Sequence, residues 1–422
     1  MSEPEIDVAV VGAGAAGLFA AIFTGRAASA GTRVVAFDGA KRLGAKILIA
    51  GGGRCNVTHD VVRPDDYAAG PGSSRNAVKK VLRSFTVEET IDFFRGRGVE
   101  LKREDTGKLF PTTDRARTVL NALLEACYEA GAELRTEHRV TAIKRREAHN
   151  DFQIATTRGE TTARRVVLST GGLALPKTGS DGFGYHLARS LGHTVTPTWP
   201  ALVPLVLPQQ HWLTALKGIA IDAELKITEP NRKVIKRQAG AMLLTHFGLS
   251  GPAAMDISRY FAGHYEKLEA KKLFANLLPR HTGESFEQHV IEQTRTHPRR
   301  SVLQLIQPHF PDRLSKALLL HGAFLDPSLP LAQLRKEDRR TLVQTLTALP
   351  LPVTADRGYA YAEVTAGGVP LSEVNLSTMA SRVCPGLYLA GELLDVDGRI
   401  GGYNFQWAWC TGRLAGRAAG PG

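Results

Sequence analysis

The chain opens on a short apolar run, then glycines, then an alanine-rich stretch. Residues 6–11 read IDVAVV, residues 12–17 read GAGAAG, and alanine-rich text continues to about residue 28. The β-branched run predicts a buried strand and the following stretch predicts a helix. A second strand is expected over residues 33–37, with Asp38 at its carboxyl end. This order is typical of the start of a doubly wound α/β sheet.

Beyond Asp38 the alternation of strands and helices stops, because residues 44–56 are rich in glycine and a polar loop follows. Thr86 and Glu89 then form a capping-box pattern, which predicts a helix that ends near Gly96. Further elements are expected as a helix from Asp114 to Gly131 and as strands near Leu109, Leu134, Phe152 and Val166.

Two groups of prolines divide the chain. The first stands at positions 197, 200, 204 and 208 and the second at 350 and 352. We interpret them as the two ends of an insertion, so that residues 1–195 and 353–422 form one domain and residues 196–352 another. Residues 196–250 are expected to be mainly β, because 219–227 alternate apolar and polar positions. Residues 251–352 are expected to be mainly helical, starting from Ser250 and Pro252.

The last seventy residues return to strand-like text. Residues 386–391 read GLYLAG, and a final helix is expected from Tyr403 to Ala419. The first domain is therefore predicted to be closed by the C-terminal part of the chain.

Composition narrows the class of protein. Of 422 residues, 43% are hydrophobic and 22% charged, which is ordinary for a soluble globular protein. The four cysteines, at 55, 127, 384 and 410, form no CxxC pair, so a disulfide framework or a metal site is not expected. The residues before the first apolar run are acidic, unlike those of a secretory signal. A soluble, cytoplasmic protein is the expectation.

The chain is basic. Lys and Arg number 53 against 41 Asp and Glu, a formal charge of +12. This excess is compatible with nucleic acid, an acidic membrane surface or anionic small molecules as partners. It is spread along the chain without a run of five like charges, which favours a solvated basic surface. Nucleic-acid binding stays open as an alternative.

The glycine motif predicts a dinucleotide site. Gly12 allows a tight turn, Gly14 lets the backbone approach a pyrophosphate, and Gly17 lets helix and strand pack closely. Asp38, twenty-one residues after Gly17, is placed to accept hydrogen bonds from ribose hydroxyls. A carboxylate there disfavours the 2′-phosphate of NADP, which leaves FAD and NAD.

The C-terminal sequence favours FAD over NAD. An extended FAD needs a second holding point for its ribityl chain and a helix N-terminus near the flavin. Gly391 and Glu392 at the end of a strand, and residues 401–404 (GGYN) at the start of a helix, offer both. The unpaired amides of that helix would stabilise negative charge on a reduced flavin.

The chain resembles the BaiN-like family of NAD(P)/FAD-dependent oxidoreductases, also known as aminoacetone-oxidase-like flavoproteins. The resemblance rests on GAGAAG (12–17), KILIAGGGRCNVT (46–58), KLFPTTDRA (108–116), STGG (169–172), THFGLSGP (245–252), TAGGV (365–369) and AGELLDVDGRIGGYNFQWA (390–408). It implies a Rossmann-like FAD-binding domain of the two-dinucleotide-fold type, interrupted by an inserted β-barrel-like plus helical domain. His59 departs from the asparagine that the family usually has there.

The resemblance also implies a set of cofactor-binding residues. These are Gly12, Gly14, Ala15, Ala16 and Gly17 at the pyrophosphate, Asp38 at the ribose, Lys46, Gly52, Gly53, Arg54, Cys55 and Asn56 along the pyrophosphate and flavin, Val140 at the adenine, Thr170 and Gly171 along the cofactor, and Gly391, Glu392, Gly402, Tyr403 and Asn404 at the flavin end.

Three side chains are candidates for chemistry. His246, in the insertion, and Tyr403, beside the flavin, are candidate catalytic acids or bases. Cys55 is a candidate redox thiol, although a close-packed small residue is the simpler interpretation. Residues 248–251 (GLSG) are more typical of a helix cap than of a hydrolase nucleophile.

These observations predict an FAD-dependent oxidoreductase that transfers a hydride between flavin N5 and a small molecule held between the two domains. No second GxGxxG occurs, so NAD(P)H is expected as a diffusible donor rather than a resident. Two alternatives stay open: an amine-type oxidase that uses oxygen, and, in a different class, an RNA-binding flavoprotein that modifies tRNA. The sequence leaves the oligomeric state undetermined.

Overall fold

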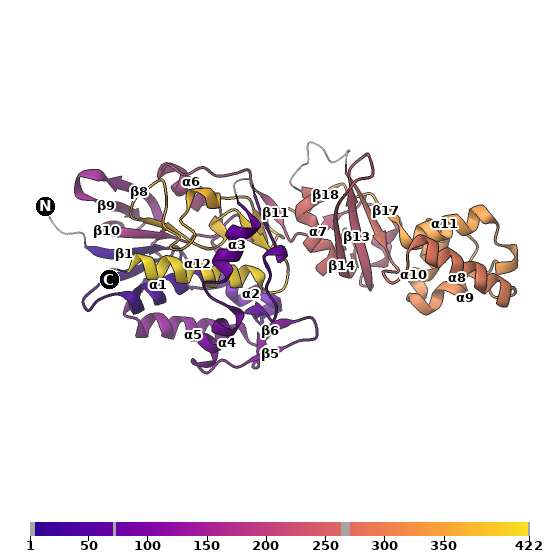
Figure 1. Cartoon of the computed structure of the whole chain (residues 1–422), viewed down its shortest axis with the longest axis horizontal. Helices are drawn as coiled ribbons and strands as arrows, with labels where there is room; N and C mark the ends of the chain where they lie inside the picture. Colours follow the sequence, from indigo (N-terminus) through magenta and orange to yellow (C-terminus); the bar gives the residue numbers. More distant parts are fainter. Residues whose placement is uncertain (1–4, 71–72, 263–270, 421–422) are drawn as a thin grey trace. The chain divides into compact units, whose positions relative to one another are not determined.

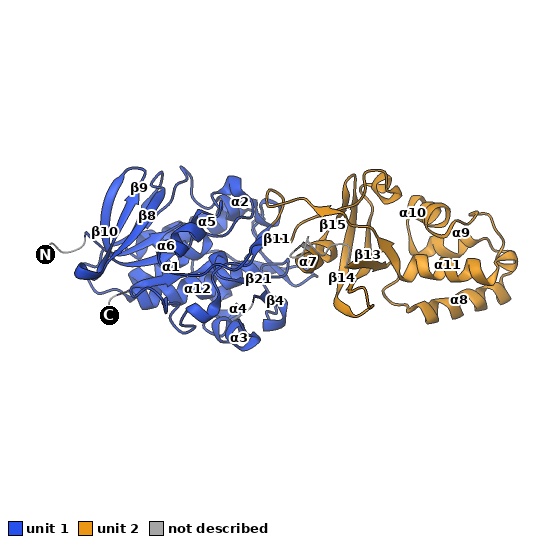
Figure 2. Cartoon of the chain, turned by 90° about the horizontal axis from the view of Figure 1, so that it is seen from above, with its two compact units in different colours: residues 1–199, 363–422 blue, residues 200–362 orange. Residues whose placement is uncertain are grey.

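The computed structural model describes residues 5–70, 73–262 and 271–420. The chain forms two compact units, which Figure 2 colours separately: unit 1 is residues 1–199 and 363–422, and unit 2 is residues 200–362. The chain returns to unit 1 later than the proline pair at 350 and 352 predicts. The reason is that strands β17 (Leu349–Leu351) and β18 (Ala355–Asp356) both belong to the sheet of unit 2.

Unit 1 is built on a seven-stranded sheet in the order β7-β2-β1-β10-β9-β8, with β20 also paired to β10. The pairs β2–β7, β1–β2, β1–β10 and β10–β20 are parallel, whereas β8, β9 and β10 form an antiparallel meander. The strands are β1 (Ile6–Val11), β2 (Val34–Phe37), β7 (Ala132–Arg135), β8 (Val140–Arg146), β9 (Asp151–Thr156), β10 (Gly159–Leu168) and β20 (Leu387–Leu389). This is the predicted Rossmann-like α/β sheet (Figure 1).

Helices and short strands complete unit 1. The helices are α1 (Ala15–Ala27), α2 (Ala45–Gly53), α3 (Arg75–Leu82), α4 (Val87–Arg95), α5 (Ala116–Glu129), α6 (Phe183–Ser190) and α12 (Tyr403–Ala419). The short strands are β3 (Thr58–His59), β4 (Tyr67–Ala69), β5 (Leu101–Arg103), β6 (Lys108–Pro111), β11 (Trp199–Ala201), β19 (Val364–Ala366) and β21 (Val396–Gly398).

Several predicted elements are confirmed. Helix α4 has Thr86 as its N-cap with a complete capping box, and α12 spans the predicted residues. Helix α5 starts two residues later than expected, after Arg115. No helix was predicted in the glycine-rich segment, but it begins as helix α2, and the backbone leaves the helical conformation from Ala50 onward.

Helices α1 and α12 pack in parallel at the centre of unit 1, where Figure 1 shows them side by side. A Cβ on Gly412 would lie 2.5 Å from the Ala16 carbonyl oxygen, and one on Gly416 would overlap Ala20. The two backbones therefore touch at positions that advance together along both helices. In this register α12 begins before α1 along their common direction. At 1.5 Å per residue the two starts are about 12 Å apart.

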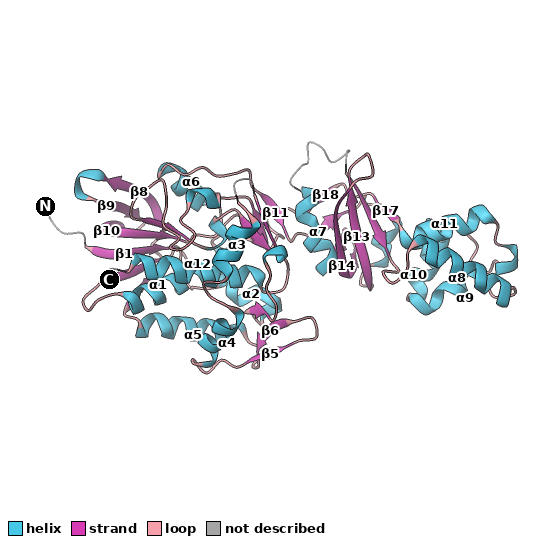
Figure 3. Ribbon diagram, viewed as in Figure 1, coloured by secondary structure: helices cyan, strands magenta, loops and turns pink. Residues whose placement is uncertain are grey.

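Unit 2 combines a sheet, against which α7 lies, with a separate group of helices, α8 to α11 (Figure 3). The antiparallel sheet has the order β17-β16-β13-β14-β15-β12-β18. Its other strands are β12 (Leu205–Val206), β13 (Ala220–Thr228), β14 (Val234–Thr245), β15 (Gly248–Ser250) and β16 (Lys272–Asn276), and its helices are α7 (Pro252–Ala262), α8 (Gly283–Thr296), α9 (Val302–Ile306), α10 (Asp312–Ala317) and α11 (Lys336–Thr347). One continuous apolar core joins the sheet and the helices.

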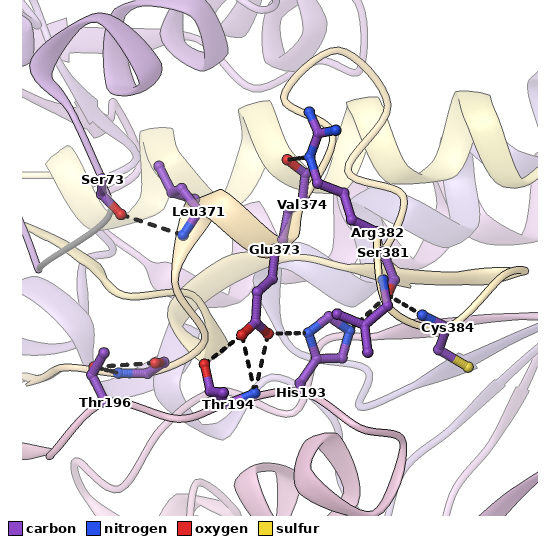
Figure 4. Close-up of polar contacts among 12 residues, drawn as sticks. Ser73, His193, Thr194, Thr196, Leu371, Glu373, Val374, Ser381, Arg382 and Cys384 are labelled. Atoms are coloured by element: carbon purple, nitrogen blue, oxygen red, sulfur yellow. Dashed lines mark hydrogen bonds and ion pairs between the residues drawn. The ribbon is translucent and has the colours of Figure 1, made fainter.

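A polar cluster around the buried side chain of His193 connects the C-terminal part of unit 1 to the segment after α6 (Figure 4). The Glu373 carboxylate lies 2.7 Å from Nδ1 of His193 and accepts from the Thr194 amide and hydroxyl. On the other side of the imidazole, Nε2 lies 2.7 Å from Ser381 Oγ. Ser381 Oγ already accepts two backbone amides, from Val383 and Cys384, so it is a structural hydroxyl and not a free nucleophile.

None of the helices in the described part of the chain has the length and apolar character of a membrane-spanning segment.

Candidate functional site

The glycine loop between β1 and α1 lies against the end of β10. Gly12 has φ +94°, and a Cβ there would lie 2.8 Å from the carbonyl oxygen of Ser169. A Cβ at Gly17 would overlap the Gly12 carbonyl oxygen. Both positions thus require glycine, for the physical reasons the motif predicts. The loop and Thr170 are brought together from 158 residues apart.

Asp38 follows β2 and faces the same loop. Its Oδ2 accepts from the Ala13 amide at 2.9 Å and its Oδ1 from the Ala40 amide at 2.8 Å. The carboxylate is thereby oriented while lone pairs remain on both oxygens. Val140 is the first residue of β8, and the backbone amide of His138 just before it donates to the Asp38 carbonyl at 2.8 Å. The two residues predicted at the adenosine end are therefore neighbours.

Helix α2 ends in three glycines of left-handed conformation, Gly51, Gly52 and Gly53, with φ of +57°, +69° and +85°. The turn is closed by the Cys55 amide, which donates to the Ala50 carbonyl at 2.9 Å. This exposed backbone precedes the buried pair Cys55 and Asn56. At these glycines the segment therefore exposes its main chain and no side chains.

A charged pair joins two predicted cofactor residues that are 346 positions apart. Lys46 Nζ, on α2, lies 2.7 Å from Glu392 Oε2, and both side chains are largely buried. The other carboxylate oxygen accepts from the Thr365 amide at 2.9 Å. Thr365 Oγ1 in turn accepts from the amides of Leu173 and Ala174 at 2.7 and 3.0 Å. Thr365 was not among the predicted site residues, although it lies in the TAGGV motif.

The segment at Gly391 is fixed by helix α12. The Gly391 amide donates to Thr411 Oγ1 at 2.9 Å, and Trp407 Nε1 donates to the Gly391 carbonyl at 3.2 Å. Gly391 also approaches Ala16, because a Cβ there would lie 2.8 Å from the Ala16 methyl. The sequence motif contained Trp407 and Thr411, but only the structure shows that they orient this turn.

The N-terminus of α12 has no side-chain cap. Its N-cap is Gly402, with φ +95°, and the first turn carries no acidic residue. The Asn404 side chain is turned to Gly398, accepting from its amide at 2.8 Å and donating to its carbonyl at 3.0 Å. Asn404 therefore offers its backbone amide, not its side chain, to anything at the helix end. The N-terminus of α1 is likewise uncapped, at Gly14.

Arg54 and Cys55 are less suited to a direct role. The Arg54 guanidinium pairs with Glu104 at 2.6 Å and Asp114 at 3.6 Å and stacks on Phe110. Cys55 is completely buried, and burial raises the pKa of its thiol to about 12. A thiol in this state is protonated and unreactive, so the structure favours the packing interpretation over the redox one.

The two candidate catalytic side chains have different environments. Tyr403 is buried in unit 1, and its ring stacks on His59 with centroids 4.8 Å apart. His59 accepts the Val61 amide at Nδ1, and its Nε2 lies 3.0 Å from the Thr106 carbonyl. His246 is exposed in unit 2, in the turn between β14 and β15.

The residues of unit 1 fit a flavin dinucleotide. A Cβ at Gly14 would have no protein atom within 4 Å, so this part of the loop is open. Among the described residues, Asn56 Oδ1 and Thr170 Oγ1 are buried without a hydrogen-bond partner. Two uncapped helix N-termini, about 12 Å apart along one direction, suit an anionic pyrophosphate and a flavin separated by a ribityl chain.

Comparison with known proteins identifies the family. The HI0933-like protein Rossmann domain matches residues 6–418. The chain belongs to the HI0933-like family. It is accordingly an oxidoreductase of the flavoprotein class, with FAD as the family's cofactor, and the resemblance to BaiN-like proteins is confirmed.

Two curated relatives of this HI0933-like protein match it over nearly their whole length. One, 36% identical over 408 residues and covering 96% of each chain, is the ribosomal RNA dihydrouridine synthase of Escherichia coli (strain K12). The other, 35% identical over 417 residues and covering 98% of each chain, is the 3-dehydro-bile acid delta(4,6)-reductase of Clostridium scindens. A solved structure, the 3-ketosteroid-delta4-(5alpha)-dehydrogenase of Rhodococcus jostii RHA1, superposes with a TM-score of 0.49 at 17% identity, covering 99% of this chain and 98% of that one.

Proposed function

We propose that this protein is an FAD-dependent reductase that adds hydrogen across a carbon–carbon double bond conjugated to a carbonyl group. The observation that carries the proposal is what the names of the two relatives share. Dihydrouridine is uridine in which the ring double bond beside a carbonyl is saturated. A delta(4,6)-reductase of a 3-oxo bile acid saturates double bonds conjugated to that ketone. The molecules differ, but the reduced bond is of one chemical type.

In this proposal FAD is held by the predicted set in unit 1. Gly12, Gly14 and Gly17 take the pyrophosphate at the α1 N-terminus, and Asp38 takes the ribose. The flavin end is held by the main chain around Gly52 and by the uncapped start of α12. Because Lys46 is paired with Glu392, it contributes an oriented, nearly neutral pair rather than a free cation.

The reduction needs two electrons and two protons in total. Once NAD(P)H has reduced it, FAD in this site would supply the two electrons together with one proton as a hydride. NAD(P)H is proposed as the diffusible donor, because the sequence has one GxGxxG and a basic surface that attracts its phosphates. His246 is the better candidate for delivering the second proton, since its ring is exposed and an imidazole can act as a general acid. Buried Tyr403 is assigned to packing beside the flavin end.

A second candidate, a uracil ring in RNA as the substrate, is favoured by the charge of unit 2. This unit carries 21 Lys and Arg residues against 14 Asp and Glu, more than half of the net charge of the chain. Phosphate contacts by such a surface give binding that weakens steeply with salt. A titration of protein-free ribosomal RNA at increasing salt tests this candidate, and affinity independent of salt would contradict it.

The proposed reduction is tested by mass. The holoenzyme is incubated anaerobically with NADPH and either a uridine-containing ribosomal RNA fragment or a 3-oxo-4,6-diene steroid. We expect one of these probes to gain the mass of two hydrogens, and the same probe to stay unchanged when NADPH or FAD is left out. Loss of two hydrogens from an amine probe in air, with no gain in either unsaturated probe, would contradict the proposal.

A further inference from the structure

Unit 2 contains an arginine in contact with two aromatic rings. The guanidinium carbon of Arg357 lies 3.5 Å from the ring centroid of Tyr361 and 4.4 Å from that of Phe247. The Phe247 ring also packs against His246, with centroids 5.0 Å apart. Strand β12 brings these distant segments together, because it pairs with β15 on one side and β18 on the other. Backbone bonds from Leu207 to Phe247 and from Arg357 to Pro204 complete the junction.

Within the part of the chain that the structure describes, the charge of the Arg357 guanidinium is not paired. In residues 5–70, 73–262 and 271–420 no carboxylate or carbonyl accepts from its side chain, and the group is only partly exposed. Arg54 of unit 1 offers a direct contrast, since it also stacks on a phenylalanine but pairs with two carboxylates. The two ring contacts restrain the Arg357 guanidinium, and its N–H groups lie in the plane of the group, where they can donate to a ligand.

Two polar side chains beside Arg357, those of Asp356 and Tyr361, have atoms without a hydrogen-bond partner among the described residues. Asp356 Oδ1 accepts from the Gly358 amide at 2.6 Å, but Oδ2 is buried without a partner among the described residues. Burial raises the pKa of this carboxyl. Tyr361 is 50% exposed and makes no described hydrogen bond through its hydroxyl. A group of unpaired donors and aromatic faces around one oriented cation is typical of a ligand-binding site rather than of a structural cluster.

We propose that Arg357 recognises the substrate by donating its edge N–H groups to the carbonyl oxygen conjugated to the reduced double bond. This inference rests on the proposed function. When hydrogen adds to such a bond as hydride, negative charge collects on the conjugated oxygen, and an oriented guanidinium stabilises it. The exposed ring of Tyr361 suits the flat, unsaturated part of the same molecule. The ligand class is therefore a planar, conjugated carbonyl compound.

The test compares Arg357→Leu and Arg357→Lys with Arg295→Leu, a matched control in the same unit. Arg295 is exposed on α8 and pairs with Glu292 three residues away. The probes are the 3-oxo-4,6-diene steroid and the uridine-containing RNA fragment. Three quantities are measured: the dissociation constant of the oxidised holoenzyme for each probe, kcat/KM, and the rate of flavin bleaching by NADPH without a probe.

For the probe that the wild type uses, we expect Arg357→Leu to weaken binding at least tenfold and to lower kcat/KM about a hundredfold. Arg357→Lys should recover part of both losses, because it keeps the charge without the planar fork. Flavin bleaching, the melting temperature and every property of Arg295→Leu should stay at the wild-type value.

The outcomes separate the two proposals. Wild-type binding and kcat/KM in Arg357→Leu overturn the role of Arg357 and leave the reductase standing. Probe binding that requires Arg357, without any turnover by the wild type, overturns the reductase only. A wild type that neither binds nor reduces either probe overturns both.

Discussion

The cofactor region of unit 1 and the Arg357 cluster of unit 2 differ in how their cationic side chains are paired. In unit 1 two cations of this region lie in ion pairs, Lys46 with Glu392 and Arg54 with Glu104. Its open surfaces are backbone, at Gly14, Gly52 and the start of α12. In unit 2 the side chains of Arg357, Asp356 and Tyr361 keep unpaired polar groups.

This difference suggests a division of labour. Backbone amides bind a pyrophosphate whatever the side chains are, so a site made of main chain suits a cofactor such as FAD. Side chains can be exchanged singly, so a site made of them suits substrates that differ, as the names of the two relatives do.

The largest effect is expected from Gly17→Ala, set against Gly14→Ala. The Cβ at Gly17 overlaps the Gly12 carbonyl, so this variant should lose about 3 kcal/mol or more of stability. The Cβ at Gly14 meets no protein atom, so the apoprotein should lose less than about 1 kcal/mol. FAD affinity of Gly14→Ala should nevertheless fall at least tenfold. Urea unfolding of the apoprotein and FAD titration measure the two. Tight FAD binding by Gly14→Ala would show that the cofactor lies elsewhere.

Breaking the Lys46 pair should have the next largest effect. Lys46→Met leaves Glu392 largely buried without its cation, so we expect a loss of about 2 kcal/mol in urea unfolding. The control is Lys316→Met, which removes a lysine from an exposed pair with Asp312 and should cost less than about 0.5 kcal/mol. Equal losses in the two variants would mean that the buried pair does not hold α2 to the Glu392 turn.

The Glu373 cluster should make stability depend on pH. Burial alone would raise the pKa of Glu373, but hydrogen bonds from Thr194 and His193 outweigh it and lower the pKa below the usual 4.5. The contribution of this carboxylate is therefore complete above about pH 4.5 and is lost as pH falls through the lowered pKa. Glu373→Gln should cost about 1 to 2 kcal/mol at pH 7 and flatten this acid limb. The free energy of unfolding of the wild type and of Glu373→Gln is measured from pH 3 to 7. An equal decrease in both proteins at low pH would contradict the prediction.

The smallest effect concerns the cysteines. All four are buried, and burial raises the pKa of Cys55, Cys127 and Cys410 to about 12. Native protein at pH 8 should therefore react with iodoacetamide at no cysteine within minutes, whereas unfolded protein reacts at four. The masses of labelled peptides measure this. Fast labelling of Cys55 alone would restore its interpretation as a reactive thiol.

The sequence predicted unit 1 better than unit 2, and the reason is local. Gly12, Gly14 and Gly17 are placed by backbone geometry that a short spacing encodes, Asp38 directly follows its strand, and a glycine pair precedes α12. Helix α2 was not predicted, because its apolar first turns are followed directly by three glycines, which disfavour a helix.

Contacts between side chains far apart in the sequence could not be predicted from short motifs. His193 and Glu373 are 180 residues apart, and Phe247 and Arg357 are 110 residues apart. No periodicity connects such partners, since a third segment brings each pair together. Thr365 was recognised only as part of the TAGGV motif. Its contacts could not be predicted, because they depend on which amides lie near its hydroxyl in the fold.

The most direct test of the central claim is anaerobic stopped-flow absorbance of the holoenzyme. The flavin is first bleached with NADPH or NADH and then mixed with a conjugated unsaturated carbonyl probe or with its saturated counterpart. The account predicts rapid bleaching by at least one nucleotide and rapid return of the oxidised flavin band with the unsaturated probe only. A flavin that no nucleotide bleaches, or that is reoxidised quickly by oxygen and by no unsaturated carbonyl, would contradict it.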